Sequence, residues 1–128
     1  MVQLITNGIK VSVKTRFIDT RYQNKQLNYL FSYQVTIENL GNETVQLISR
    51  HWDIFDSLNN KEIVEGEGVI GKQPVIAKNE IHVYNSFCSL ISPIGSMGGF
   101  FNMIILNTNR KFKVVIPTFQ LLIMELHN

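Results

Sequence analysis

The chain has 128 residues, with 12 Lys and Arg against 10 Asp and Glu, which leaves a formal net charge of +2 at pH 7. A charge this small argues against nucleic acid as an obligatory partner, and no apolar run approaches the roughly 20 residues that a membrane span requires. The length fits one domain over residues 1–128. Ile occurs 16 times and Val 11 times against a single alanine. Because β-branched residues favour strands and alanine favours helices, this composition predicts an all-β protein.

Cysteine usage and the N-terminal residues bear on the cellular compartment. Cys88 is the only cysteine, so no internal disulfide is possible, and a lone thiol suits a reducing compartment. Residues 1–17 contain neither a long apolar stretch nor a small-residue cleavage site, so we expect no signal peptide. These features favour a cytoplasmic location without membrane insertion.

The first half of the chain alternates apolar and polar residues, as half-buried strands do. Residues 19–28 are polar and are expected to form a connection between two strands. Further along, the alternation breaks at Leu47 and Ile48, which predicts a bulge or a strand with two buried faces. The strands of this half are expected at residues 8–18, 29–41 and 45–56.

The second half of the chain adds shorter strands separated by turn residues. We expect a tight hairpin turn at Asn59-Asn60, since Asn tolerates positive φ. Residues 62–71 read as a glycine-interrupted strand, and residues 91–99 read as a glycine-rich loop. The remaining extended segments are expected at residues 73–80, 81–90, 100–109 and 111–125, of which the last two form a hairpin.

Turn signals recur throughout the chain at short intervals, as they do in sandwiches and barrels, and no stretch combines helical length with helical period. We therefore predict an antiparallel β-sandwich of about seven to eight strands, with an immunoglobulin-like core. Trp52 lies in mid-strand and is expected to anchor the core of this sandwich.

Gly66, Gly68 and Gly71 follow the spacing G-x-G-x-x-G, which is the dinucleotide fingerprint of Rossmann domains. In those domains the motif opens a helix whose N-terminus receives the pyrophosphate, and here no helical period follows. The favoured interpretation is structural, because glycines supply bulges, positive φ or close backbone approach. The alternative is a nest of backbone N–H groups that, with Lys72, weakly binds a phosphate-containing anion.

Arg50 lies within an apolar strand beside Trp52. Either its guanidinium pairs with a carboxylate such as Glu65 or Glu80, or it reaches the surface as a binding contact, and pairing is the favoured interpretation. If an anion does bind the glycine segment, Arg50 and His51 are its expected neighbours.

The histidines are His51, His82 and His127, and none forms an H-x-x-x-H or H-x-H pair. His51 and Asp53 share one face of a strand, but zinc takes about three or four ligands, so neither a metal site nor a cofactor is expected. Cys88 lies among apolar residues, which favours an inert buried thiol over a nucleophile. No catalytic residues are therefore predicted.

Four stretches resemble the ApaG family in order and spacing, and the resemblance covers nearly the whole chain. It implies a single ApaG-type domain with a fold similar to fibronectin type III. The stretches are SRHWDIFD (49–56), GEGVIGKQPVI (66–76), SPIGSMGGFFNM (92–103) and FKVVIPTFQL (112–121).

The resemblance also implies a functional class. Bacterial members of the ApaG family are associated with cobalt resistance and magnesium efflux, and in larger eukaryotic proteins the domain looks like a protein-interaction module. We therefore expect a non-enzymatic binding module whose partner is another protein. The alternative is an enzyme or binder of nucleotides, pyrophosphate or dinucleoside polyphosphates, suggested by the glycine motif and by a hydrolase gene that often lies nearby in this family. Glu67 weakens that alternative, since a carboxylate between two of the glycines would repel phosphate.

Overall fold

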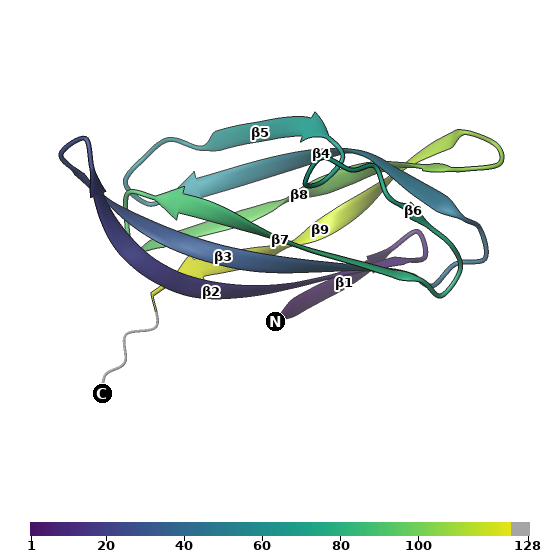
Figure 1. The fold of residues 1–128 in the computed structure, drawn as a ribbon, viewed down its shortest axis with the longest axis horizontal. Helices are drawn as coiled ribbons and strands as arrows, with labels where there is room; N and C mark the ends of the chain where they lie inside the picture. Colours follow the sequence, from purple (N-terminus) through teal and green to yellow (C-terminus); the bar gives the residue numbers. More distant parts are fainter. Residues whose placement is uncertain (124–128) are drawn as a thin grey trace.

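The computed structural model describes residues 1–123, and all regular elements within that range are strands (Figure 1). No helix among these residues could cross a membrane. The strands, in chain order, are β1 (Val2–Thr6), β2 (Ile9–Gln23), β3 (Gln26–Asn39), β4 (Val45–Asp56), β5 (Glu62–Glu67), β6 (Val75–Ile76), β7 (Ile81–Leu90), β8 (Ile94–Ile105) and β9 (Arg110–Leu122).

The strands form two antiparallel sheets that pack into a sandwich, which confirms the predicted fold class. The four-stranded sheet has the order β1-β2-β3-β7. The five-stranded sheet has the order β5-β4-β8-β9, and the short strand β6 pairs with β4 beside β5. The sequence predicted about seven to eight strands, and β1 is the one that the alternation did not reveal. It is short, and of its residues only the first and last are partly buried.

The interior of the sandwich is built from alternate residues of both sheets. Val11 of β2 and Val35 of β3 are fully buried from one side, and Phe101 of β8 from the other. Trp52 is buried and makes edge-to-face ring contacts with Tyr33 and with Phe119, at centroid distances of 5.5 and 5.9 Å. The core position expected for Trp52 is therefore confirmed, and its ring joins the two sheets.

The connection predicted over residues 19–28 is wrong. Strands β2 and β3 continue through it and meet in a two-residue turn at Asn24 and Lys25, with φ of 49° and 64°. Residues 19–23 are exposed on both faces, because this end of the hairpin extends beyond the other sheet. A polar composition is therefore compatible with a strand here, since neither face meets the core.

The glycine-rich loop predicted over residues 91–99 is confirmed only for residues 91–93 and is wrong for the rest, since β8 begins at Ile94. A Cβ on Gly95 would lie 2.2 Å from the carbonyl oxygen of Phe55, and a Cβ on Gly99 would lie 1.9 Å from that of His51. These glycines let β8 approach the β4 backbone closely, which a glycine inside a strand often does.

The course of β4 confirms one expectation and corrects another. The pairing of β4 with β8 shifts register between Leu47 and Ser49, which is the predicted bulge. The tight turn expected at Asn59-Asn60 is wrong, because neither residue has positive φ and residues 57–61 form a longer connection. Asp56 organises this connection: its carboxylate accepts the Leu58 N–H at 3.2 Å and the Ile91 N–H at 2.7 Å.

Candidate functional site

The glycine motif lies at the end of β5 and in the hairpin turn that follows it. Val69 and Lys72 exchange backbone hydrogen bonds of 2.8 and 3.0 Å around Ile70 and Gly71. Ile70 has a φ of 49° and Gly71 a φ of 72°, as in a type I′ turn. The motif therefore closes a hairpin and is not followed by the helix that a Rossmann pyrophosphate site requires.

Gly66 and Gly68 make room for neighbouring groups. At Gly68, with φ of 60°, a Cβ would lie 2.0 Å from the carbonyl oxygen of Lys72. Beside Gly66 lies the guanidinium of Arg50, whose Nη2 would be 2.8 Å from an added Cβ. Positive φ and close approach, the structural roles that the sequence favoured for these glycines, are both present.

Arg50 holds the glycine segment through its backbone. Nη1 of Arg50 donates to the carbonyl oxygens of Glu67 at 3.0 Å and Gly68 at 2.9 Å. The expected pairing with a carboxylate is wrong among the described residues, since Glu65 contacts His51 and the Glu80 carboxylate accepts the N–H of Ala77. The guanidinium donates its hydrogen bonds to backbone carbonyls because the glycine segment folds back over it.

Three backbone N–H groups of this segment already donate hydrogen bonds within the protein. Gly68 donates to the carbonyl of Ile48 at 2.8 Å, and Val69 and Lys72 donate to each other across the turn. An anion nest needs successive N–H groups that point at the ligand. An anion bound through the N–H groups of Gly68, Val69 or Lys72 would therefore compete with existing hydrogen bonds. Between Gly68 and Lys72, only the N–H groups of Ile70 and Gly71 at the tip of the turn have no backbone partner among the described residues.

Arg50 and His51 lie on opposite sides of β4, because successive side chains of a strand alternate. The structure thus groups Arg50 with the glycine segment and places His51 on the outer face of the five-stranded sheet. His51 is directly opposite Glu65 on β5 and Phe100 on β8.

His51 lies in a chain of charged groups on that face. Its Nδ1 is 2.6 Å from Oε2 of Glu65, and its Nε2 is 3.3 Å from Oδ1 of Asp53. Lys61 also contacts Asp53, with Nζ 3.2 Å from Oδ1. The hydrogen bond to Glu65 raises the pKa of His51, although partial burial opposes the shift. Desolvation raises the pKa of Asp53, but hydrogen bonds from Lys61 and His51 outweigh it and leave that pKa below its usual value.

Aromatic and aliphatic side chains surround these charged groups. The His51 ring stacks on Phe100 at 4.6 Å and 9°, and Nζ of Lys113 lies 4.3 Å from the centre of the Phe100 ring. Phe55 and Ile63 are 51% and 57% exposed on the same side of the sheet. We call this surface the His51 face; it consists of His51, Asp53, Phe55, Ile63, Glu65, Phe100, Lys113 and Val115.

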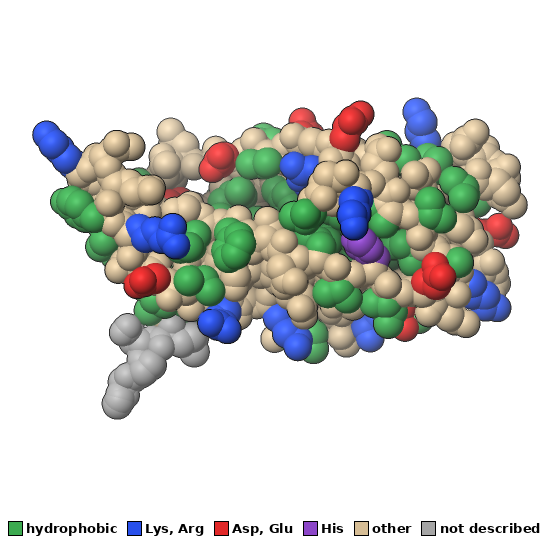
Figure 2. Space-filling model, viewed as in Figure 1, with side chains coloured by type: hydrophobic (Ala, Val, Ile, Leu, Met, Phe, Trp, Pro, Cys, Tyr) green, Lys and Arg blue, Asp and Glu red, His purple; other side chains and the backbone are tan. Residues whose placement is uncertain are grey.

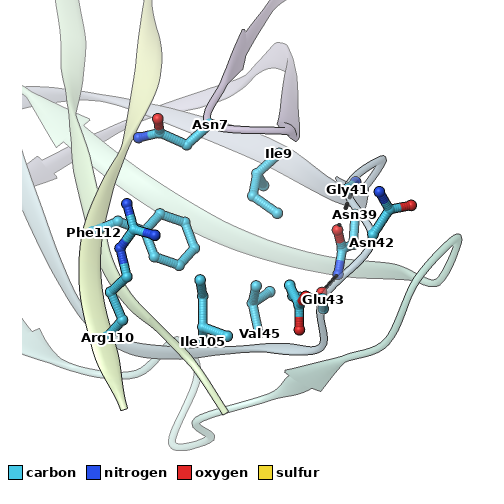
Figure 3. A pocket seen from close by; sticks show the side chains of 10 residues that line it. All are labelled: Asn7, Ile9, Asn39, Gly41, Asn42, Glu43, Val45, Ile105, Arg110 and Phe112. Carbon is cyan, nitrogen blue, oxygen red and sulfur yellow. Dashed lines mark hydrogen bonds between the residues drawn. The ribbon is translucent and has the colours of Figure 1, made fainter. Parts of the chain in front are cut away.

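A separate pocket of about 260 Å³ opens at one end of the sandwich (Figure 3). Ile105 and Phe112 form part of its apolar wall, while Arg110 and Glu43 provide charged groups. Asn39 also lines it, but its Nδ2 already donates to the carbonyls of Glu43 and Ile76. The sequence alone did not reveal this pocket, because its lining residues come from connections at one end of the sandwich and from the strand ends beside them, and they form no motif.

The remaining reactive groups are engaged or buried. Cys88 is buried, as expected, and desolvation raises its pKa to about 12. Burial lowers the pKa of His82 on β7. Within residues 1–123, no three His, Cys, Asp or Glu side chains are grouped so that they could hold a metal ion. His127 lies outside the described residues.

The sequence profile of the ApaG domain matches residues 19–105 of this chain. The chain belongs to the ApaG domain family. Among curated ApaG proteins, that of Shewanella halifaxensis is 41% identical over 117 residues, covering 91% of this chain and 92% of that protein. The ApaG protein of Methylobacterium radiotolerans is 40% identical over 121 residues, covering 94% and 92% respectively.

Solved structures show the same fold. A structure from Bordetella pertussis described as an ApaA protein superposes with a TM-score of 0.84 at 37% identity, covering 92% of this chain and 95% of that one. An X-ray structure of a structural-genomics target superposes with a TM-score of 0.87 at 35% identity, covering 95% and 96%.

The stretches that carry the resemblance to the ApaG family come together in one sheet. Residues 49–56 lie in β4, between β5 with its glycine turn on one side and residues 94–103 of β8 on the other. The ApaG-like stretches thus build the glycine turn and most of the His51 face, to which β5 adds Ile63 and Glu65.

Proposed function

We propose that this ApaG-domain chain is a non-enzymatic protein-interaction module and that its partner binds the His51 face. The observation that carries the proposal is the group of exposed aromatic and aliphatic side chains on this face, led by Phe55 and Ile63. Exposed apolar side chains that are grouped together often mark a binding surface, whereas single ones are common on any folded protein.

The composition of the His51 face supports a protein partner. Protein interfaces combine an apolar and aromatic centre with a polar, charged rim. Here the stacked rings of His51 and Phe100 lie beside Phe55 and Ile63, and Lys113 and Glu65 add charges of both signs. Strand pairing fixes the backbone that carries these groups, so binding has to order only their side chains.

The non-enzymatic part of the proposal rests on the state of the candidate reactive groups. Cys88 is buried with a raised pKa, which keeps it as a thiol. Both ring nitrogens of His51 contact carboxylates, so the ring is not free to act as a general base.

We propose that the partner protein, and not this chain, accounts for the association of the ApaG family with cations. Family resemblance links the protein to cobalt resistance and magnesium efflux. We place the cation-handling step in the bound protein, in the cytoplasm, and give this chain the role of an accessory subunit.

The test is a quantitative pull-down from native cytoplasm with wild-type protein and with the double variant Phe55→Ser, Ile63→Ser. Both side chains are exposed, so folding is retained, and the proposal expects specific captured proteins to be lost. Ile5→Ser is the control, because Ile5 is equally exposed but lies on β1 of the other sheet. Equal capture by all three proteins would refute the His51 face as the binding surface.

A second measurement separates this proposal from polyphosphate chemistry. Purified protein is incubated with a dinucleoside polyphosphate, and Lys72→Ala serves as the comparison. The proposal expects no turnover by either protein. Turnover that depends on Lys72 would show that the protein is an enzyme.

A further inference from the structure

Strand β7 is the unprotected edge of this sandwich. Edge strands present unpaired N–H and C=O groups, and proteins usually blunt them with charges, prolines, bulges or short length. Here β1 is only 5 residues long, β5 carries Glu62, Glu65 and Glu67, and β9 carries Arg110, Lys111, Lys113 and Pro117. The ten residues of β7, IHVYNSFCSL, include no Lys, Arg, Asp, Glu, Pro or Gly, and the strand pairs with β3 without a register shift.

The hydrogen-bonding direction along β7 follows from its pairing with β3. The N–H of Asn39 donates to the carbonyl of Glu80, so this pair is hydrogen-bonded, and hydrogen-bonded pairs recur at every second residue of an antiparallel ladder. Even-numbered residues of β7 therefore bond to β3, and odd-numbered residues point their backbone groups away from it. Ile91, the next odd-numbered residue, agrees with this assignment, since its N–H turns to the Asp56 carboxylate.

The same odd-numbered residues carry the exposed side chains of β7. Ile81, Val83 and Phe87 are 56%, 47% and 64% exposed, and Asn85 and Ser89 are exposed as well. In Figure 2 hydrophobic side chains lie along the band that β7 occupies in Figure 1. Within residues 1–123, β3 is the only strand in extended contact with β7. The free edge thus combines unpaired backbone groups with an apolar outer face.

We infer that β7 pairs with β7 of a second copy of this chain, antiparallel and about a two-fold axis at Asn85, so that the two four-stranded sheets become one continuous sheet. This self-association is independent of the proposed function, since the His51 face belongs to the other sheet.

The sequence of β7 matches this symmetric pairing. With the axis at Asn85, Val83 faces Phe87 of the second copy, and Ile81 faces Ser89. All the odd-numbered residues then form hydrogen-bonded pairs, whereas a two-residue slip leaves some of them unpaired. Two apolar Val–Phe contacts flank the Asn–Asn pair, and cross-strand pairs of this kind stabilise sheets.

A second copy suits this edge better than a charged peptide. In an isologous strand pair each residue faces a residue of the same strand in the second copy, so a strand with charges of one sign would bring like charges together. The strand carries no charge to repel its symmetry mate. Because the contact is one strand wide, its area is at the small end for specific interfaces, and the dimer is expected to depend on protein concentration.

The test is sedimentation equilibrium of the full chain as its concentration is raised. The wild type is expected to move from the monomer mass of 14.7 kDa toward twice that value. The double variant Val83→Lys, Phe87→Lys is expected to stay monomeric, because lysines then face each other across the pair. A monomer at every accessible concentration of the wild type would overturn the inference.

Charge complementation tests the antiparallel register itself. The variant Val83→Glu, Phe87→Glu is also expected to be monomeric alone, but mixing it with the double-lysine variant places Lys opposite Glu at both positions and restores a heterodimer. Ile5→Lys, at an equally exposed position on β1, is the control and should dimerise like the wild type. Failure of the mixed variants to associate, or loss of the dimer in the control, would contradict the pairing, and native circular dichroism of each variant confirms its folding.

Discussion

Replacing Gly68 with alanine tests whether the glycine motif serves the fold. Two costs arise at this position. An L-residue in the left-handed region costs about 1–2 kcal/mol. In addition, the new Cβ would lie 2.0 Å from the Lys72 carbonyl oxygen, which accepts the N–H of Val69. Moving that carbonyl breaks the hydrogen bond, at about 1 kcal/mol, and disturbs the buried Val69 side chain. We expect a total loss of about 3 kcal/mol in the free energy of unfolding.

Gly71→Ala is the matched control. Gly71 also has positive φ, but an added Cβ there meets nothing within 4 Å. Both substitutions reduce the entropy of the unfolded chain equally, so that contribution cancels between them. The difference of about 2 kcal/mol between the variants therefore measures the close approach at Gly68 alone.

The assay is urea unfolding followed by the fluorescence of Trp52, the only tryptophan. With a slope of about 2 kcal/mol per molar urea, the Gly68 variant should unfold about 1 M earlier than the Gly71 variant. Equal midpoints for the two variants would refute the structural role that we assign to Gly68.

Three further predictions concern the turn, the His51 face and the thiol. Ile70 is a β-branched residue at φ of 49°, so Ile70→Asn should raise the free energy of unfolding by about 1 kcal/mol in urea titrations, and a destabilised variant would contradict the turn type. The hydrogen bond to Glu65 raises the pKa of His51 above 6.5. The wild type should therefore exceed His51→Gln in stability most fully below pH 6.5, and this advantage should fall as pH rises through the folded pKa, in unfolding curves measured across pH. Burial raises the pKa of Cys88 to about 12, so a disulfide reagent should modify the native protein orders of magnitude more slowly than the unfolded one, and similar rates would show that the thiol is accessible.

Local pattern was sufficient to locate most strands and the core. The boundaries predicted for residues 45–56 and 81–90 coincide with those of β4 and β7. Alternation of apolar residues reports directly on which side of a strand meets the interior, and a large side chain in mid-strand, Trp52, is expected to fill it. These features are properties of consecutive residues, so the sequence by itself determined the fold class and much of the core. The family assignment also came from the sequence, because it rests on several stretches in fixed order.

The contacts around His51 and Arg50 depend on the register between strands that are distant in the chain. His51 meets Glu65 and Phe100 because the pairings of β4 with β5 and of β4 with β8 place them opposite each other. The Arg50 guanidinium binds carbonyls instead of a carboxylate because the segment after β5 folds back over it. Neither contact follows from neighbouring residues, since register is set by how all the strands pack.

Glycine shows the same division between sequence and structure. The spacing G-x-G-x-x-G is identical in a phosphate-binding loop and in a hairpin turn, and only the tertiary structure shows that Gly68 faces a carbonyl. Gly95 and Gly99 suggested a loop by composition, but they lie inside β8. Their lack of a side chain lets the carbonyls of β4 approach closely. A glycine in the sequence indicates that another group comes close to its backbone. Which group that is depends on the packing of distant strands.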